Sequence, residues 1–281
     1  TANSQGELRR LWQVSLADRK STPLTAAIDM SIEDVAFSAD GRRLWLQAED
    51  RGMVPVFAMD AAGGAVSKIV ANGSNTELDS ADGQLGFLGE TSSRAPELFA
   101  LDAGGKPRQL TRFNDDLFAG LDLGKVESHE FQGAGGDTVQ AWVVYPPGFD
   151  PKKKYPLLQL LHGGPHTMVR DAFSYRWNSH VFASPGYIVT WVNRHGSTGF
   201  GEAFARSING AWGDKPTEDV LKANEYLFGK IPAIDRDNVA AAGASYGGYL
   251  ATWLLGHTKA FKTLVNHAGV SDFMGQYGAD T

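Results

Sequence analysis

The sequence predicts the last blades of a β-propeller followed by a doubly wound α/β domain with a mostly parallel sheet. Three observations support this fold class. The first 120 residues contain a repeat with a period of 42 residues. From about Lys125 onward, compact apolar runs alternate with helical patterns. A Gly-x-Ser-x-Gly pattern stands where a predicted strand passes into a predicted helix. We expect one domain over residues 1–121 and a second over 122–281.

The composition excludes several classes of protein. The chain has 281 residues with a net charge of -6, which argues against a nucleic-acid or anionic-membrane partner because both favour a basic face. No apolar run reaches the roughly 18 residues of a membrane span. The chain has no cysteine, which excludes a disulfide scaffold, a thiolate metal site and a cysteine nucleophile. The compartment stays open between cytoplasmic and periplasmic or secreted, because exported proteins can also lack cysteine.

The repeat has two independent landmarks. Asp40-Gly41 and Asp82-Gly83 are 42 residues apart, and so are Phe57–Asp60 and Phe99–Asp102. A Gly-Gly pair follows each of the latter segments, Gly63-Gly64 in the first copy and Gly104-Gly105 in the second. Asp-Gly between apolar alternations predicts a two-residue hairpin turn, which needs positive φ. Four strands in about 40 to 45 residues make one propeller blade. An ordinary β-sandwich is the alternative.

The number of blades is small for a propeller. Leu11–Leu16 has the pattern of the end of a preceding blade, so the sequence holds about two and a half blades. Propellers close with about four to eight, and an open fan would leave strand edges unpaired. We therefore expect further blades on the N-terminal side of this sequence.

The α/β part begins with three predicted strands. Val139–Tyr145 alternates apolar and polar residues and ends at a Pro-Pro-Gly turn. Tyr155–Leu161 and Tyr187–Val192 are compact apolar runs, as expected of strands buried on both faces of a parallel sheet.

A helix follows these strands, with Pro216 near its first position. Glu218 and Asp219 are expected in its first turn, where acids favour the helix dipole. Its buried stripe contains Val220, Ala223 and Leu227. The next strand, Val239–Ala242, leads into a second helix whose apolar positions are Leu250, Trp253 and Leu254.

Gly243-x-Ser245-x-Gly247 lies between this strand and this helix. The pattern matches a nucleophile elbow, in which a tight turn presents a serine hydroxyl and the flanking glycines avoid collisions. A bare match is weak, but the strand before it, the helix after it and the additional Gly248 strengthen it. We predict that Ser245 is the nucleophile of an α/β hydrolase, with a purely structural turn as the alternative.

A second motif, Leu160–His166, follows a predicted buried strand and contains Gly163-Gly164. Hydrolysis of an ester or amide passes through a tetrahedral oxyanion that backbone N–H groups stabilise. Such a glycine loop commonly supplies one N–H, and the residue after the nucleophile, here Tyr246, supplies another. A plain strand-ending turn is the alternative.

Several ordered motifs between residues 125 and 281 resemble the catalytic domain of the prolyl oligopeptidase family of serine peptidases, in the branch of the acylaminoacyl-peptidases and dipeptidyl-peptidase V-like enzymes. They are HGGPH, NRHGSTGFG, AWGDKPTEDV, AAGASYGGY and LVNHAGVSDF. The resemblance implies Ser245 as the nucleophile, the N–H groups of Tyr246 and Gly164 as the oxyanion hole, short peptides as substrates and no cofactor. Gly163 is the alternative to Gly164.

Two positions depart from related patterns. Ala244 stands where dipeptidyl-peptidase IV-like members usually carry Trp, which favours the other branch. His195 stands where Arg often stands in the family's glycine loop, so no role is assigned to it.

The acid and the histidine of a catalytic triad are not identified in this sequence. They should follow the serine in the order acid, then histidine, and only 36 residues follow Ser245. We expect both beyond residue 281, on a continuation of the chain or on a separate chain. The residues considered and not assigned are His162, His166, His180, His195, His257, His267, Asp272 and Asp280. No metal-ligand spacing is evident.

The function that these motifs indicate is hydrolysis of short peptides by a serine peptidase, with this segment alone nearly inactive. A carboxylesterase-like hydrolase and a non-catalytic propeller and hydrolase binding protein are the alternatives.

Overall fold

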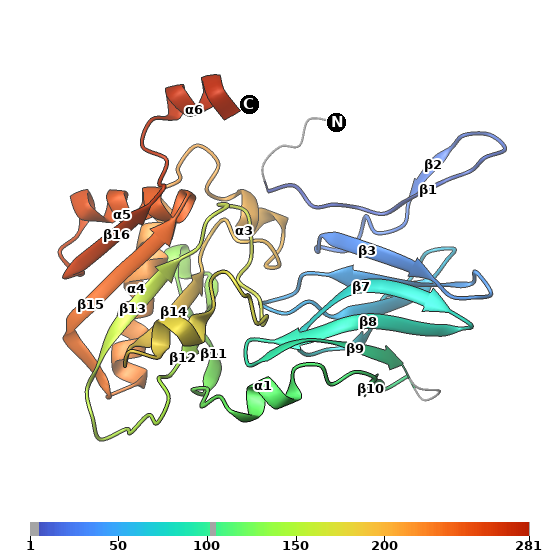
Figure 1. Cartoon of the computed structure of the whole chain (residues 1–281). Helices are drawn as coiled ribbons and strands as arrows, with labels where there is room; N and C mark the ends of the chain where they lie inside the picture. Colours follow the sequence, from blue (N-terminus) through green and yellow to red (C-terminus); the bar gives the residue numbers. More distant parts are fainter. Residues whose placement is uncertain (1–5, 102–104, 281) are drawn as a thin grey trace. The chain divides into compact units, whose positions relative to one another are not determined.

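The computed structural model describes residues 6–101 and 105–280, which form two compact units (Figure 1). Unit 1 contains the described residues up to 121 together with 170–177 and 198–203. Unit 2 contains residues 122–169, 178–197 and 204 onward. Asp102, Gly104 and the side chain of Asp280, which the sequence analysis named, lie outside the described part.

Unit 1 is built from antiparallel sheets. Each copy of the 42-residue repeat supplies one four-stranded sheet, with strand orders β3-β4-β5-β6 and β10-β9-β8-β7. The first sheet consists of β3 (Ile32–Phe37), β4 (Arg43–Ala48), β5 (Val56–Asp60) and β6 (Ser67–Val70). The second consists of β7 (Ser74–Ala81), β8 (Gln84–Thr91), β9 (Arg94–Leu101) and β10 (Pro107–Gln109). A two-stranded sheet of β1 (Trp12–Val14) and β2 (Ser21–Pro23) precedes them, and a short helix, α1 (Asp115–Ala119), follows them.

The two Asp-Gly turns differ. Asp82 and Gly83 both have positive φ, 51° and 77°, and join β7 to β8 directly, as the sequence predicts. Between β3 and β4, however, Ser38 N donates to Arg43 O, which leaves a four-residue loop, so the predicted two-residue turn is wrong there. The Asp40 carboxylate accepts hydrogen bonds from Ser38 Oγ at 2.7 Å and from Arg42 N at 3.0 Å. These bonds stabilise the longer loop.

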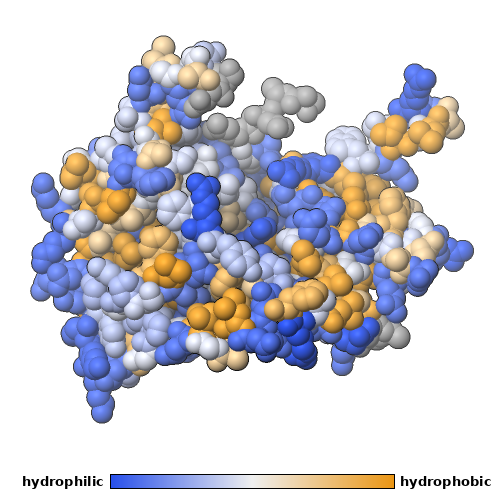
Figure 2. Space-filling view, in the orientation of Figure 1, coloured by the Kyte–Doolittle hydropathy of each residue, from blue (hydrophilic) through white to orange (hydrophobic). Residues whose placement is uncertain are grey.

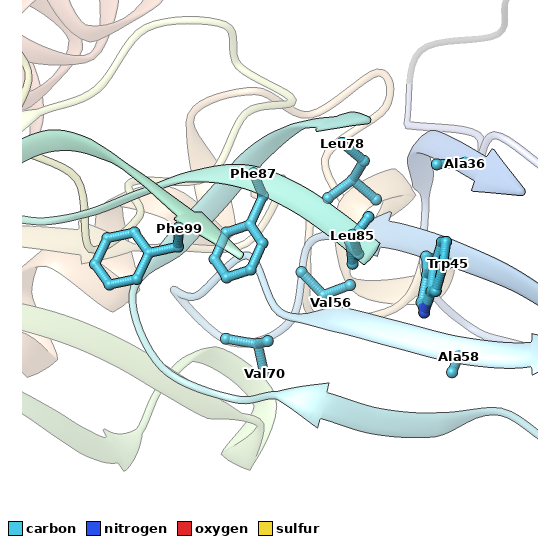
Figure 3. Close-up of a cluster of buried hydrophobic side chains, with 9 residues drawn as sticks. All are labelled: Ala36, Trp45, Val56, Ala58, Val70, Leu78, Leu85, Phe87 and Phe99. Atoms are coloured by element: carbon cyan, nitrogen blue, oxygen red, sulfur yellow. The ribbon is translucent and has the colours of Figure 1, made fainter. Parts of the chain in front are cut away.

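One of the buried apolar clusters of unit 1 lies between its two four-stranded sheets (Figure 3). The first sheet contributes Trp45 and Val56, and the second contributes Leu85, Phe87 and Phe99. The rings of Phe87 and Phe99 stack with their centroids 5.7 Å apart. Residues that alternate along one strand thus bury one face of each sheet against the other.

Apolar side chains are also exposed in unit 1. In Figure 2, orange apolar atoms lie on the hairpin of β1 and β2, where Val14 and Leu16 are exposed. The described residues leave these side chains uncovered.

Unit 2 contains a mixed six-stranded sheet with the order β11-β12-β14-β13-β15-β16. Its strands are β11 (Val126–Gln132), β12 (Thr138–Val144), β13 (Tyr155–Leu161), β14 (Ile188–Asn193), β15 (Ile234–Ala244) and β16 (Thr263–His267). The β11–β12 and β12–β14 pairings are antiparallel, and the other three are parallel. β15 begins five residues before the predicted Val239, with a register shift where it pairs with Pro156 and Leu157 of β13.

Helices cover both faces of this sheet. Trp191 and Val192 are neighbours on β14 and therefore point to opposite faces. Trp191 Nε1 donates to Ser179 Oγ in α2 (Ser179–Ala183) at 2.9 Å. Val192 packs with Ala223 of α4 (Asp214–Lys230) on the opposite face. Helix α5 (Tyr246–His257) packs beside α4 on that same face. The remaining helical segments are η1 (Ala134–Gly136), α3 (Glu202–Arg206) and α6 (Phe273–Asp280).

α4 begins earlier than predicted. It starts at Asp214, so Pro216 is its third residue. A helix tolerates proline there, because the N–H groups of the first turn have no intrahelical acceptor. Glu218 and Asp219 are therefore the fifth and sixth residues of the helix, so their predicted place in the first turn is wrong. Asp219 is fully buried. Val220, Ala223 and Leu227 are buried as predicted. None of the described helices is long and apolar enough to span a bilayer.

Candidate active site

Ser245 lies at the turn between β15 and α5. Its φ of 57° and ψ of -122° are unusual for a residue other than glycine and cost about 1 to 3 kcal/mol. The backbone holds this conformation, since Ser245 N donates to His267 O at 3.1 Å and Tyr249 N donates to Ser245 O at 3.0 Å. The residue is exposed. A strained, hydrogen-bonded turn thus presents a serine hydroxyl to solvent.

The surrounding glycines are required by close backbone contacts. A Cβ on Gly243 would collide with the backbone of Gly247, and a Cβ on Gly247 would collide with the carbonyl oxygen of Leu161. A Cβ on Gly248 would lie 2.6 Å from Asn266 Oδ1. Side chains at these three positions would therefore push α5 away from the strands.

The sheet register brings the other glycine motif beside Ser245. β13 and β15 are parallel, and Leu161 pairs with Gly243, so both strands end at the same edge. A Cβ on Gly163 would lie 3.1 Å from Ala244 O and 4.0 Å from Ser245 Oγ. A Cβ on Gly164 would instead meet the backbone N of His166, at 2.8 Å. Gly163 therefore lies directly against the serine.

The peptide between the two glycines has a fixed orientation. Gly163 O accepts hydrogen bonds from His162 Nδ1 at 2.8 Å and from Thr167 Oγ1 at 3.0 Å. In a trans peptide the N–H points away from the preceding carbonyl oxygen, and the Gly163–Gly164 peptide is trans. The Gly164 N–H is therefore directed away from His162 and Thr167.

His162 is part of this loop and is neutral. Burial, and then the positive charge of Arg194, lower the pKa of His162 well below its usual value. Because Nδ1 donates to Gly163 O, Nε2 is the acceptor for the Ser197 hydroxyl, 3.0 Å away. The ring thus connects the Gly163 loop to the loop that follows β14.

Tyr246 is the first residue of α5, so the helix itself offers no acceptor for its backbone N–H. Its side chain is buried, and its hydroxyl donates to Trp212 O at 2.5 Å. Burial raises the pKa of Tyr246 to about 12. The phenol is therefore neutral and anchors the start of the helix.

Asp219 and His195 form a buried pair that the sequence analysis did not foresee. Asp219 accepts hydrogen bonds at 2.7 Å from Ala134 N, His195 N and His195 Nδ1. His195 Nε2 lies 3.0 Å from Asp137 Oδ2, and the ring stacks on Phe204. The sequence held one signal for the burial of Asp219, which is its position directly before Val220, the first residue of the apolar stripe of α4. His195 thus connects loops rather than approaching Ser245.

The other unassigned residues have these places. His257 Nδ1 lies 2.7 Å from Trp253 O at the end of α5, and His166 Nδ1 lies 3.1 Å from Gly196 O. His180 is buried in α2, while His267 ends β16 opposite Ala244. Asp272 accepts from Gly275 N at the start of α6. Across residues 6–101 and 105–280, no group of three or more His, Cys, Asp or Glu side chains could hold a metal ion.

Known proteins are similar to this chain over most of its length. The probable dipeptidyl-peptidase 5 of Aspergillus clavatus is 35% identical to this chain in an alignment 283 residues long. The alignment covers 94% of this chain and 38% of that protein. Dipeptidyl-peptidase 5 of Trichophyton equinum is 35% identical over 90% of this chain and 36% of its own length. The chain thus spans less than two fifths of these relatives.

Solved structures show the same fold. The acylaminoacyl peptidase of Pyrococcus horikoshii matches 97% of this chain and 42% of its own with a TM-score of 0.85 and 26% identity. A puromycin-hydrolyzing peptidase of Mycobacterium tuberculosis has a TM-score of 0.75 over 96% of this chain and 43% of its own, at 21% identity. Residues 173–281 also match the model of the prolyl oligopeptidase family. This part of the chain therefore belongs to the prolyl oligopeptidase family, as its motifs indicated.

Proposed function

We propose that the intact protein is a serine peptidase that hydrolyses short peptides through an acyl-enzyme on Ser245. The observation that carries this proposal is the position of Ser245, exposed on a strained turn directly against Gly163. The relatives named dipeptidyl-peptidase 5 and acylaminoacyl peptidase support peptides cleaved near the N-terminus as the substrate class.

In the proposed reaction, Ser245 Oγ forms a bond to the carbonyl carbon of the substrate and gives its proton to a histidine. The N–H groups of Tyr246 and Gly164 stabilise the oxyanion. The C–N bond then breaks, the amine leaves with the proton, and water hydrolyses the acyl-enzyme.

We also propose that the acid and the histidine of the triad, and further propeller blades, come from residues outside this sequence. The coverage of 36 to 38% of the relatives supports this. Residues 1–281 alone would then be nearly inactive, because loss of the base costs on the order of 10⁴ to 10⁶ in turnover.

The test replaces Ser245 in the intact protein. Ser245→Ala should abolish fluorophosphonate labelling and lower kcat by at least about 10⁴. Ser184→Ala, at an exposed serine that ends α2, is the matched control and should behave as wild type. Dipeptidyl-anilide, acylaminoacyl-anilide and p-nitrophenyl ester substrates are compared by kcat/KM. Cleavage of esters with no cleavage of peptides, or labelling that persists in Ser245→Ala, would contradict the proposal.

A further inference from the structure

Arg194 is a charged residue buried behind the candidate oxyanion hole. Its side chain is among the largest in unit 2 that are almost completely removed from solvent, with 1% of its surface exposed. Burial of a guanidinium is costly unless its donors are used. The groups that Arg194 contacts therefore indicate why a guanidinium is buried at this place.

Arg194 contacts both halves of that hole. On the glycine-loop side, Nη2 donates to His162 O at 3.0 Å, and Nη1 lies 3.4 Å from Pro165 O. These two carbonyls flank Gly163 and Gly164. On the helix side, Cζ lies 4.3 Å from the centroid of the Tyr246 ring, a cation–π distance. One side chain thus spans the loop and the first residue of α5.

The partners of Arg194 are all neutral. Besides the Tyr246 ring, they are the carbonyl oxygens of His162, Pro165 and His195, the last at 3.2 Å from Nη1. Its Nε has no hydrogen-bond partner among the described residues. Carbonyl dipoles and a π face orient a guanidinium without cancelling its charge. Such a group fixes the geometry of the loop more tightly than a neutral side chain could.

We propose that Arg194 is the positioning residue of the oxyanion hole, holding the Gly163–Gly164 loop and Tyr246 at the spacing that a tetrahedral oxyanion needs. This inference rests on the proposed function. It concerns the transition state, because backbone donors act on the oxyanion and only weakly on the bound substrate.

The test uses Arg194→Met and Arg194→Lys in the intact protein. Misplacing a catalytic group by about 1 Å can cost roughly 100-fold. We expect kcat to fall about 10- to 100-fold in both variants, with KM changed by less than about threefold. Lys keeps the charge but cannot reach the carbonyls and the ring together. Arg236→Met is the matched control, because Arg236 also donates to a carbonyl, Phe228 O, and lies over the Phe228 ring.

A second measurement separates positioning from general structural damage. A peptide aldehyde forms a tetrahedral adduct with the serine, whereas the corresponding peptide acid binds without one. Affinity for the aldehyde should fall by the same factor as kcat/KM, and affinity for the acid should stay unchanged. If Arg194→Met does not fold, the comparison in Arg194→Lys decides.

Three results would overturn the inference while the proposed function stands, with Ser245→Ala inactive. One is wild-type kcat in a folded Arg194→Met variant. Another is an equal loss of affinity for aldehyde and acid. The third is wild-type turnover in Arg194→Lys alone, since charge without positioning would then suffice.

Discussion

Gly163 and Gly164 are adjacent, yet the structure restricts them differently. A side chain at Gly163 is limited by Ala244 O, which precedes Ser245, whereas Gly164 has a φ of 120° that side chains rarely adopt. Substitution of the two glycines by alanine should therefore act through different contacts.

Gly163→Ala should lower kcat by about 100-fold, because the new methyl group would lie 3.1 Å from Ala244 O and would push the loop away from the serine. Its melting temperature should change little. Gly164→Ala should lower the free energy of unfolding by about 1 to 3 kcal/mol through backbone strain, and should lower kcat as well because its N–H is a proposed oxyanion donor. Gly186→Ala, at a residue with a φ of 103° and an open space around the added Cβ, is the matched control and should keep the wild-type kcat. Steady-state kinetics and urea unfolding check all three variants. Full kcat in Gly163→Ala would show that this glycine does not border the reacting hydroxyl.

The sequence predicted the site residues that depend on local pattern and missed those that depend on tertiary contacts. Ser245 and its glycines follow from a strand-to-helix turn. No local pattern indicated a role for Arg194, because its partners His162, Pro165 and Tyr246 lie 29 to 52 residues away in the sequence. Asp219 was assigned to the helix dipole for the same reason: nothing local reveals Ala134 or His195 as its partners.

At the level of elements, α4 is tied to two loops through Asp219 and His195. Both ring nitrogens of His195 face carboxylate oxygens, so both can donate only when the ring is protonated. Burial lowers the pKa of His195, but the hydrogen bond to Asp219, the charge of Asp219 and the hydrogen bond to Asp137 outweigh it and raise the pKa above 6.5. The link is therefore strongest when His195 is charged.

This link should make stability depend on pH. Because the folded pKa lies above the unfolded value of 6.5, the stabilisation is fully present below about pH 6.5 and is lost as pH rises through the folded pKa. His195→Asn should destabilise the protein by about 2 kcal/mol at pH 6 and by less at pH 9, measured by urea unfolding. His257→Asn, at the exposed end of α5, is the control. An equal loss at both pH values would contradict the charged state of His195.

The elements themselves were largely predictable from periodicity. β13 has the predicted bounds, because Tyr155–Leu161 is apolar except for Gln159. β15 begins early because the polar stretch Asp235–Asn238 pairs beside a register shift, which apolar patterning cannot detect. The Asp40 loop differs from the Asp82 turn because side-chain hydrogen bonds compete with the tight turn.

At the scale of the whole molecule, unit 1 uses residues that are distant in sequence. Asp171 accepts hydrogen bonds from Ser92 N at 2.7 Å and Ser92 Oγ at 2.8 Å, at the turn between β8 and β9. Phe173 N donates to Glu90 at 2.9 Å. Segment 170–177 thus stabilises the β8–β9 hairpin of the second four-stranded sheet through these hydrogen bonds.

Asp171→Ala should therefore loosen this sheet. We expect faster amide hydrogen exchange at Ser92 and its neighbours and a loss of about 1 to 3 kcal/mol, because the Ser92 N–H loses its acceptor. Asp116→Ala, at an exposed position in α1, is the control. Unchanged exchange at Ser92 would show that the carboxylate does not hold this turn in solution.

Segments 170–177 and 198–203 also affect how such a protein can be recombined. The chain passes between the two units five times, so a cut between residues 121 and 122 would leave 14 residues of unit 1 on the other piece. Blades transplanted from a relative would arrive without those residues, Asp171 among them. Exchanging the blades is therefore a three-segment graft, and the two units are expected to change together during evolution or engineering.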